Sequence, residues 1–294
     1  MKWTRSILAE LATIRKKLQT AQQNRRYSRT GLPFRDWCFL FLPNYFTLEP
    51  SPLHEDLFAT HERIKLERGA RESRIAPRSS GKSAIISTAY PLYGSLEGFE
   101  EYIVLTSDTG EQAKKYLGSI RDELHANQKI RKAYPWVAWK WAEDTTKAIE
   151  LPNGVRIEAL GTGSKLRGRR HREHRPSHIV ADDPQNTMHM VSELQRTRSW
   201  DWLTKDVCNA GGPKTNIVVA GTALHQECIV CRLETPAYGV GWKTRKYKAI
   251  MEWPARMDLW NEWERILHDP QSTPEDAMAN AKRYYLQHEA DMVA

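Results

Sequence analysis

A short run of small and basic residues, from Ala76 to Ser83, constrains this chain more than any other feature. Its letters are APRSSGKS, and an apolar, helix-compatible run over 84–89 follows it directly. A loop of small residues at a helix N-terminus turns backbone N–H groups toward phosphate oxygens. A lysine in such a loop reaches the terminal phosphates, and a serine or threonine hydroxyl helps to hold Mg²⁺. The run therefore predicts a phosphate-binding loop made of Pro77, Arg78, Ser79, Ser80, Gly81, Lys82 and Ser83. The alternative is a polar turn between a strand and a helix, since Ala76 stands where the usual pattern has glycine.

A second motif lies about a hundred residues later, where an apolar run ends in Asp182 and Asp183. A buried strand that presents carboxylates at its C-terminal end supplies what a nucleotide site in an α/β sheet needs. We expect Asp182 and Ser83 to hold Mg²⁺, with water between Asp182 and the metal. We expect Asp183 to orient and deprotonate the attacking water. Asp-Asp-Pro is also turn chemistry, so a strand end capped by a turn is the alternative.

Length and composition limit the class of protein. The chain has 294 residues, of which 40% are hydrophobic, enough for a packed core and for one large α/β domain or a domain with appendages. A net charge of +8 favours a polyanionic partner, and nucleic acid is the commonest one. No apolar run approaches the roughly 20 residues of a membrane span, and no signal-peptide core follows Met1. We therefore predict a cytoplasmic protein with no membrane partner.

The order of the expected elements predicts the fold class. Strands are expected at 102–106, 155–160, 176–183, 216–220 and 243–247, with helices at 3–24, 54–68, 108–126, 188–206 and 275–288. Asn153-Gly154 is a hairpin signal before the second of these strands. Strands that alternate with helices predict an α/β protein with a mostly parallel sheet and helices on both faces. Polar loops follow three strand ends, including Gly221-Thr222, so a ligand is expected beyond the carboxyl ends of the strands.

Basic residues are densest over 161–175, just before the strand that ends in Asp182. One arginine of this stretch could reach a phosphate across a subunit boundary, as an arginine finger does. Several could instead hold DNA phosphates, which would make binding depend strongly on salt. A solvated loop is the third interpretation. The candidates for the first two roles are Arg167, Arg170 and Arg172.

The four cysteines offer one weak metal motif. His225, Cys228 and Cys231 form H-x₂-C-x₂-C, a spacing that zinc sites use. The stretch looks helical and has no second close pair of ligands, so small buried thiols are the preferred interpretation.

Taken in order, these motifs resemble the ATPase half of the large terminase subunit of tailed bacteriophages. The resemblance spans most of the chain, although many members have glutamate where this chain has Asp183. The residues that carry it are Pro77 to Ser83, Ile103 to Thr109 with Gln112-Ala113, Asn153-Gly154, 161–163 and 166–168, Arg175-Pro176 with Asp182-Asp183, and Ala220 to His225.

The resemblance implies a P-loop NTPase fold of the ASCE type. It implies an ATP-driven motor that needs Mg²⁺ and threads double-stranded DNA into a procapsid in the host cytoplasm. The partners it implies are a portal protein, a small terminase subunit and further copies in a docked ring, with a monomer when alone. By resemblance, Arg78 senses the γ-phosphate and contributes to catalysis with Lys82 and Asp183, while Thr222 couples hydrolysis to movement.

Three regions are expected from this resemblance. Residues 1–50 would form an N-terminal helix and an aromatic-rich lead-in, residues 51–250 the ATPase core, and residues 251–294 a segment leading toward a nuclease domain. We predict no nuclease activity for this chain. Two other functions stay open: another DNA-dependent P-loop ATPase, such as a helicase, and a non-catalytic DNA-binding assembly subunit with a degenerate nucleotide site.

Overall fold

The computed structural model describes residues 27–250 and 252–293, so the helix expected at 3–24 lies outside the described residues. The chain divides into two compact units, and the division falls between Tyr247 and Lys248. The candidate site lies wholly in the first unit.

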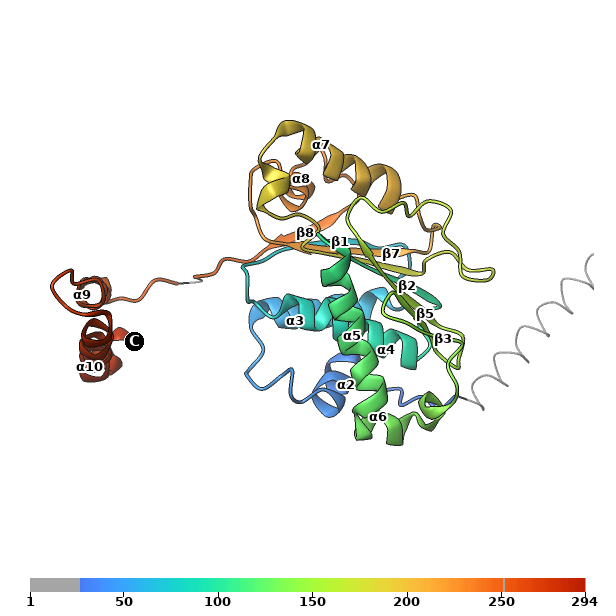
Figure 1. The fold of residues 1–294 in the computed structure, drawn as a ribbon, viewed down its shortest axis with the longest axis horizontal. Helices are drawn as coiled ribbons and strands as arrows, with labels where there is room; N and C mark the ends of the chain where they lie inside the picture. The colour runs from blue at the N-terminus through green and yellow to red at the C-terminus, as the bar shows by residue number, and fades with distance from the viewer. Residues whose placement is uncertain (1–26, 251, 294) are drawn as a thin grey trace, which may run out of the picture. The chain divides into compact units, whose positions relative to one another are not determined.

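The first unit is built on an eight-stranded sheet in the described part of the chain (Figure 1). Its order is β3-β4-β5-β2-β6-β7-β1-β8. Neighbours from β5 to β8 run parallel, whereas β3, β4 and β5 pair antiparallel. The predicted mostly parallel α/β sheet is therefore confirmed. The strands are β1 Arg71–Ile75, β2 Tyr102–Ser107, β3 Glu143–Asp144, β4 Ala148–Glu150, β5 Arg156–Gly161, β6 His178–Asp182, β7 Asn216–Gly221 and β8 Lys243–Lys246.

Helices cover both faces of this sheet (Figure 1). Successive residues of a strand point to opposite faces, and both faces of β2 are buried. Ile103 and Leu105 join one hydrophobic cluster, while Tyr102 and Val104 join the other. One face carries α2 Phe34–Phe41, α3 Pro52–Ile64, a π-helix Ala84–Ala89 that continues into α4 Tyr90–Leu96, α5 Gly110–Ala126 and α6 Gln128–Ala133. The other face carries α7 Glu193–Asp201, a π-helix Trp202–Val207 and α8 Ile229–Glu234.

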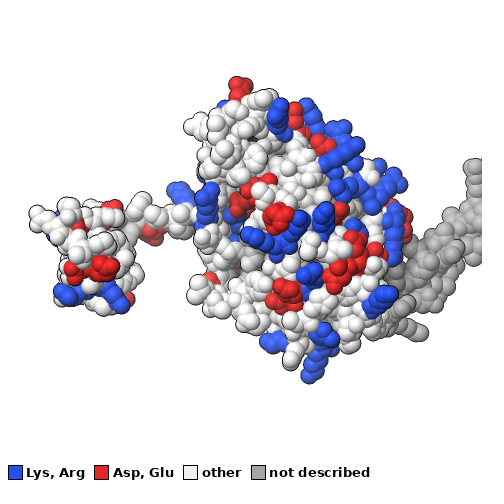
Figure 2. Space-filling view, viewed as in Figure 1, with Lys and Arg blue, Asp and Glu red and all other residues white. Residues whose placement is uncertain are grey.

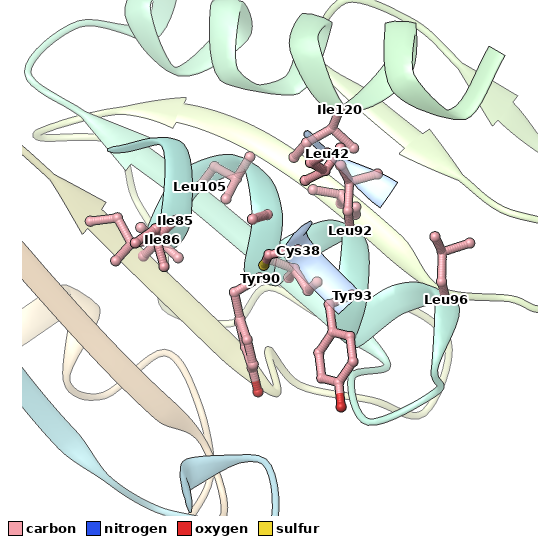
Figure 3. Close-up of a cluster of buried hydrophobic side chains, with 14 of the residues drawn as sticks. Cys38, Leu42, Ile85, Ile86, Tyr90, Leu92, Tyr93, Leu96, Leu105 and Ile120 are labelled. Atoms are coloured by element: carbon pink, nitrogen blue, oxygen red, sulfur yellow. The ribbon is translucent and has the colours of Figure 1, made fainter. Parts of the chain in front are cut away.

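The aromatic-rich lead-in is part of the core of the first unit. Cys38 and Leu42 lie among buried side chains of α4 and of the π-helix that follows the candidate loop (Figure 3). Trp37, fully buried in α2, donates from Nε1 to the hydroxyl of Tyr134 at 2.7 Å. Ile85 and Ile86 are also fully buried. The helix that begins at the candidate loop is therefore fixed by packing along its length.

Several elements differ in detail from the sequence predictions. The hairpin at Asn153-Gly154 is confirmed, because β4 and β5 pair on either side of it and Gly154 has a φ of 88°. The helix predicted at 108–126 is α5, which begins at Gly110, and Thr109 caps it because its side chain accepts the Gln112 N–H. The helix expected at 188–206 is divided into a 3₁₀ turn over Thr187–Met190, α7 and the π-helix. A 3₁₀ turn that was not predicted follows α6 over Pro135–Ala138.

The second unit contains two helices, α9 Met257–Leu267 and α10 Pro274–Met292, among its described residues. The second helix was predicted at 275–288, whereas the first was not predicted. Trp260 joins them, because its Nε1 donates to the Met292 carbonyl at 2.9 Å and its ring contacts Tyr285. No helix in the described ranges is both long and apolar enough to cross a membrane.

Candidate nucleotide-binding site

The loop between β1 and the following π-helix has a backbone arrangement that suits an anion. Ser79 and Gly81 both have positive φ angles, 59° and 75°. The N–H groups of Ser79, Ser80 and Gly81 donate to no other described residue. Where successive residues alternate between right-handed and left-handed backbone conformations, their N–H groups converge and form a concave nest for a phosphate or another anion. The loop therefore presents the donors that a phosphate-binding role requires.

Ala76, the departure from the usual motif, fits its place without strain. Its N–H donates to the Gly221 carbonyl at 3.0 Å, and its side chain is buried in the core. The φ angle of Ala76 is not positive, so an L side chain is tolerated there. Glycine is not needed at this position of the loop.

The sheet order brings the strand that ends in Asp182 close to this loop. The strand β7 separates β1 from β6 and pairs in parallel with both, so all three end at the same edge. Asp182 is fully buried, and its Oδ2 accepts a hydrogen bond from Ser87 Oγ at 2.7 Å. The Ser83 side chain lies near this carboxyl group and favours its charged form. Burial raises the pKa of Asp182 above its ordinary value, because the charged form is poorly solvated there.

The surroundings of Asp182 fit a magnesium ion. Its Oδ1 is buried and has no hydrogen-bond partner among the described residues. A carboxylate oxygen and the hydroxyl of Ser83 are the hard oxygen ligands that Mg²⁺ takes, usually one or two from the protein with several waters. No cluster of three or more histidine, cysteine or acidic side chains suited to a metal occurs in the ranges that the structure describes. A magnesium site here would therefore use few protein ligands.

Asp183 occupies a different environment from Asp182. Its backbone is left-handed, with a φ of 42°, and its side chain reaches the lysine of the loop. Oδ2 lies 3.0 Å from Lys82 Nζ, and Oδ1 accepts the Thr222 N–H at 3.1 Å. The Asp183 side chain is 39% exposed, whereas that of Lys82 is 5% exposed. A carboxylate that is reached by solvent and paired with a buried ammonium group can hold a water molecule once the lysine moves.

Thr222 follows β7 and contacts Asp183. Its N–H is the donor to Asp183, and its hydroxyl oxygen is buried without a partner among the described residues. Ser80 Oγ in the loop is likewise buried and unpartnered. Buried polar atoms are normally satisfied, so such atoms around one edge of a sheet indicate that a polar ligand or water completes the site.

The structure separates the candidate arginines. Arg78 is exposed in the loop and has no ion pair within the described residues. Arg167 lies 3.6 Å from Asp206, and Arg172 pairs with Glu150, so both are held within their own chain. Arg170 is exposed and has no partner in the part of the chain that is described. Figure 2 shows Lys and Arg side chains mixed with Asp and Glu over the visible face of the first unit. The Lys and Arg side chains are densest along one flank of that face.

Two residues at the site were not predicted. Tyr116 of α5 lies close to the side chains of Ser83 and Asp182, and burial raises its pKa to about 12. His54 of α3 contacts the loop backbone, with Nε2 lying 2.7 Å from the Ser80 carbonyl oxygen. Both residues belong to helices, and no local sequence motif indicates where these helices pack on the sheet.

The H-x₂-C-x₂-C motif lies around the start of α8. Cys228 occupies the N-cap position of α8, and Cys231 lies beside it one turn on. Burial raises the pKa of Cys231 to about 12, which keeps it a neutral thiol. His225 uses Nδ1 to accept the Glu227 N–H at 3.0 Å. The motif remains without an assigned role.

No protein-family model matches this chain, and no curated protein matches it.

Proposed function

We propose that this chain is an ATP-hydrolysing motor domain of the large-terminase type, which drives double-stranded DNA into a procapsid. The observation that carries the proposal is the pair formed by Lys82 and Asp183, whose charged atoms lie 3.0 Å apart. The two residues follow β1 and β6, which end at the same edge of the sheet. The insertion of β7 between these strands is the arrangement that the proposed P-loop NTPase fold of the ASCE type requires.

The chemistry proposed for this site is positioning and charge neutralisation. Bound Mg²⁺, held by Ser83 and through water by Asp182, would offset charge on the phosphates. Lys82 would leave Asp183 for the β- and γ-phosphates, and Arg78 would lie along the γ-phosphate. Asp183, no longer paired, would orient the attacking water and accept its proton.

Coupling to movement would pass through Thr222. The Thr222 N–H donates to Asp183 Oδ1, so a change in the charge or position of this carboxylate reaches the end of β7. The net charge of +8 suits a polyanionic track such as DNA. Exposed Arg170 is the member of the basic stretch best placed to act outside its own chain. A portal protein, a small terminase subunit and further copies in a ring, in the host cytoplasm, complete the proposal.

Steady-state ATP hydrolysis with Mg²⁺, with and without double-stranded DNA, tests this function. The variant Lys82→Ala should lose turnover, whereas Lys132→Ala, which removes an exposed lysine of α6, should not. Stimulation by DNA would favour the motor over an ATPase of another kind. DNA binding without any nucleotide binding would contradict the proposal and favour a DNA-binding assembly subunit.

A further inference from the structure

We propose that His54 is a positioning residue of the phosphate loop, which orients the peptide between Ser80 and Gly81 for phosphate binding. The inference rests on the proposed function, because it assigns a role within the same nucleotide site. His54 belongs to α3, a helix that precedes β1 in the sequence and carries none of the predicted site residues.

The hydrogen bonds of the His54 ring decide which tautomer its neutral form adopts. Ser51 caps α3, and its backbone N–H donates to His54 Nδ1 at 3.1 Å. Nδ1 is therefore an acceptor, and the ring proton of the neutral imidazole is on Nε2. Nε2 faces the Ser80 carbonyl oxygen at 2.7 Å, and a carbonyl oxygen can only accept. The ring therefore links the N-terminus of α3 to the backbone of the loop.

Holding this carbonyl also sets the direction of the next N–H group. In a planar trans peptide the C=O and N–H bonds point in opposite directions, and the described residues contain no cis peptide. The Ser80 carbonyl points toward α3, so the Gly81 N–H points away from it, toward the concave side of the loop. That N–H has no acceptor among the described residues, which is the state that a phosphate oxygen would satisfy.

Nothing else in the described structure holds this part of the loop. The bond from His54 is the one hydrogen bond that residues 77–80 form with another element in the described ranges. The loop is otherwise tied at its two ends, where Ala76 donates to Gly221, Ala84 donates to the Gly81 carbonyl at 3.1 Å and Lys82 pairs with Asp183. His54 is therefore the single brace in the middle of the loop.

The close approach of His54 leaves no room for a side chain at Gly81. A Cβ atom at Gly81 would stand 2.7 Å from His54 Nε2, which is closer than such atoms approach. The φ of 75° independently disfavours any L side chain there. Glycine at this place in the loop therefore permits both the left-handed turn and the close approach of the imidazole.

Two variants of nearly equal shape distinguish the hydrogen bond that His54 makes to the loop from the bond that it makes at the N-terminus of α3. His54→Gln keeps an acceptor for the Ser51 N–H and an N–H donor for the Ser80 carbonyl. His54→Glu keeps the acceptor, as in an ordinary capping box, but places an oxygen against the carbonyl oxygen. The probes are the non-hydrolysable ATP analogue AMP-PNP and inorganic tripolyphosphate, each with Mg²⁺, measured by calorimetry on the full chain.

We expect His54→Glu to weaken both probes about ten-fold, since a lost hydrogen bond with an unsatisfied acceptor has that order of effect. His54→Gln should stay within about two-fold of the parent protein, because a neutral amide can replace the imidazole donor. Both variants should unfold at the same temperature. A parallel loss for tripolyphosphate places the effect on the phosphates and not on the base.

Two results would overturn the inference while the proposed function stands: His54→Glu binding AMP-PNP as tightly as the parent protein, or His54→Gln losing as much affinity as His54→Glu. If the parent protein itself binds neither probe, the proposed function fails and the role of His54 fails with it.

Discussion

Lys82 Nζ lies 3.0 Å from Asp183 Oδ2, although several strands and helices separate the two residues in the sequence. Their strands are not neighbours, because β7 lies between β1 and β6. The loops after β1 and β6 meet across the end of β7, and Thr222 there donates its N–H to the same carboxylate. One carboxylate thus joins the ends of two strands and the lysine of the loop.

The variant Asp183→Asn tests the role of this carboxylate. The amide oxygen can still accept the Thr222 N–H, but the negative charge that would activate water is gone. We expect AMP-PNP binding to be kept or tightened, because Lys82 no longer has to leave an ion pair. The kcat for ATP should fall at least about 10²-fold, as for the loss of a general base. Asp201→Asn on α7 is the control, and normal turnover in Asp183→Asn would place the base elsewhere.

The buried carboxylate Asp182 should show opposite effects on function and stability. Burial raises its pKa, so a neutral side chain is better suited to this environment than a charged one. Asp182→Asn should therefore leave the free energy of unfolding unchanged or increased. It should also raise the Mg²⁺ concentration for half-maximal turnover by about ten-fold or more, because an amide is a poorer magnesium ligand.

A second variant distinguishes the effect of the Asp182 charge from the effect of the hydrogen bond that this carboxylate accepts from Ser87. Ser87→Ala removes the donor at 2.7 Å and keeps the charge, so its effect on the Mg²⁺ requirement should be the smaller one. Equal Mg²⁺ requirements for Asp182→Asn and the parent protein would rule out Asp182 as part of a metal site.

Two buried histidines should make the fold sensitive to acid. Burial lowers the pKa of His61 and of His178 to about 3, whereas a histidine in the unfolded chain titrates near 6.5. The folded state therefore resists protonation, and stability that is complete above pH 6.5 is lost as the pH falls toward 3. At pH 5 the loss should be about 2 kcal/mol for each histidine, as measured by denaturant unfolding from pH 7 to pH 5.

Replacing one of the two should reduce this acid sensitivity by about half. Both ring nitrogens of His178 are buried and lack partners among the described residues, so His178→Leu also removes two unsatisfied polar atoms. A His178→Leu protein with the full acid sensitivity would show that protons bind elsewhere.

A buried arginine should be worth far more to stability than an exposed one that shares its partner. Arg74 on β1 is 2% exposed and pairs with Asp56 and Glu72, while Arg245 on β8 is 65% exposed and also pairs with Asp56. Arg74→Met should lower the free energy of unfolding by about 3 kcal/mol or more, because two buried carboxylates lose a partner. Arg245→Met should cost about 1 kcal/mol or less. Equal effects in denaturant unfolding would contradict this assignment.

Strands and helices with a strong local pattern were predicted well. The continuous apolar runs of β2 and β7 match strands that are buried on both faces, and Asn153-Gly154 supplies its own turn geometry. Elements without such a pattern were missed or misjudged. The helix α9 lies in a stretch of tryptophans and charges, and the region 188–206 is interrupted where Ser192 caps α7 with its own side chain.

The sequence by itself determined the residue types of the site and the local conformations that carry them: a loop of small residues before a helix, and two acids after an apolar strand. Only the tertiary structure decided that β7 lies between β1 and β6, that Asp182 is buried while Asp183 faces Lys82, and that His54 and Tyr116 join the site. The physical reason is range. Periodicity and turn chemistry act between residues a few positions apart, whereas strand order and helix docking are set by packing between segments far apart in the chain.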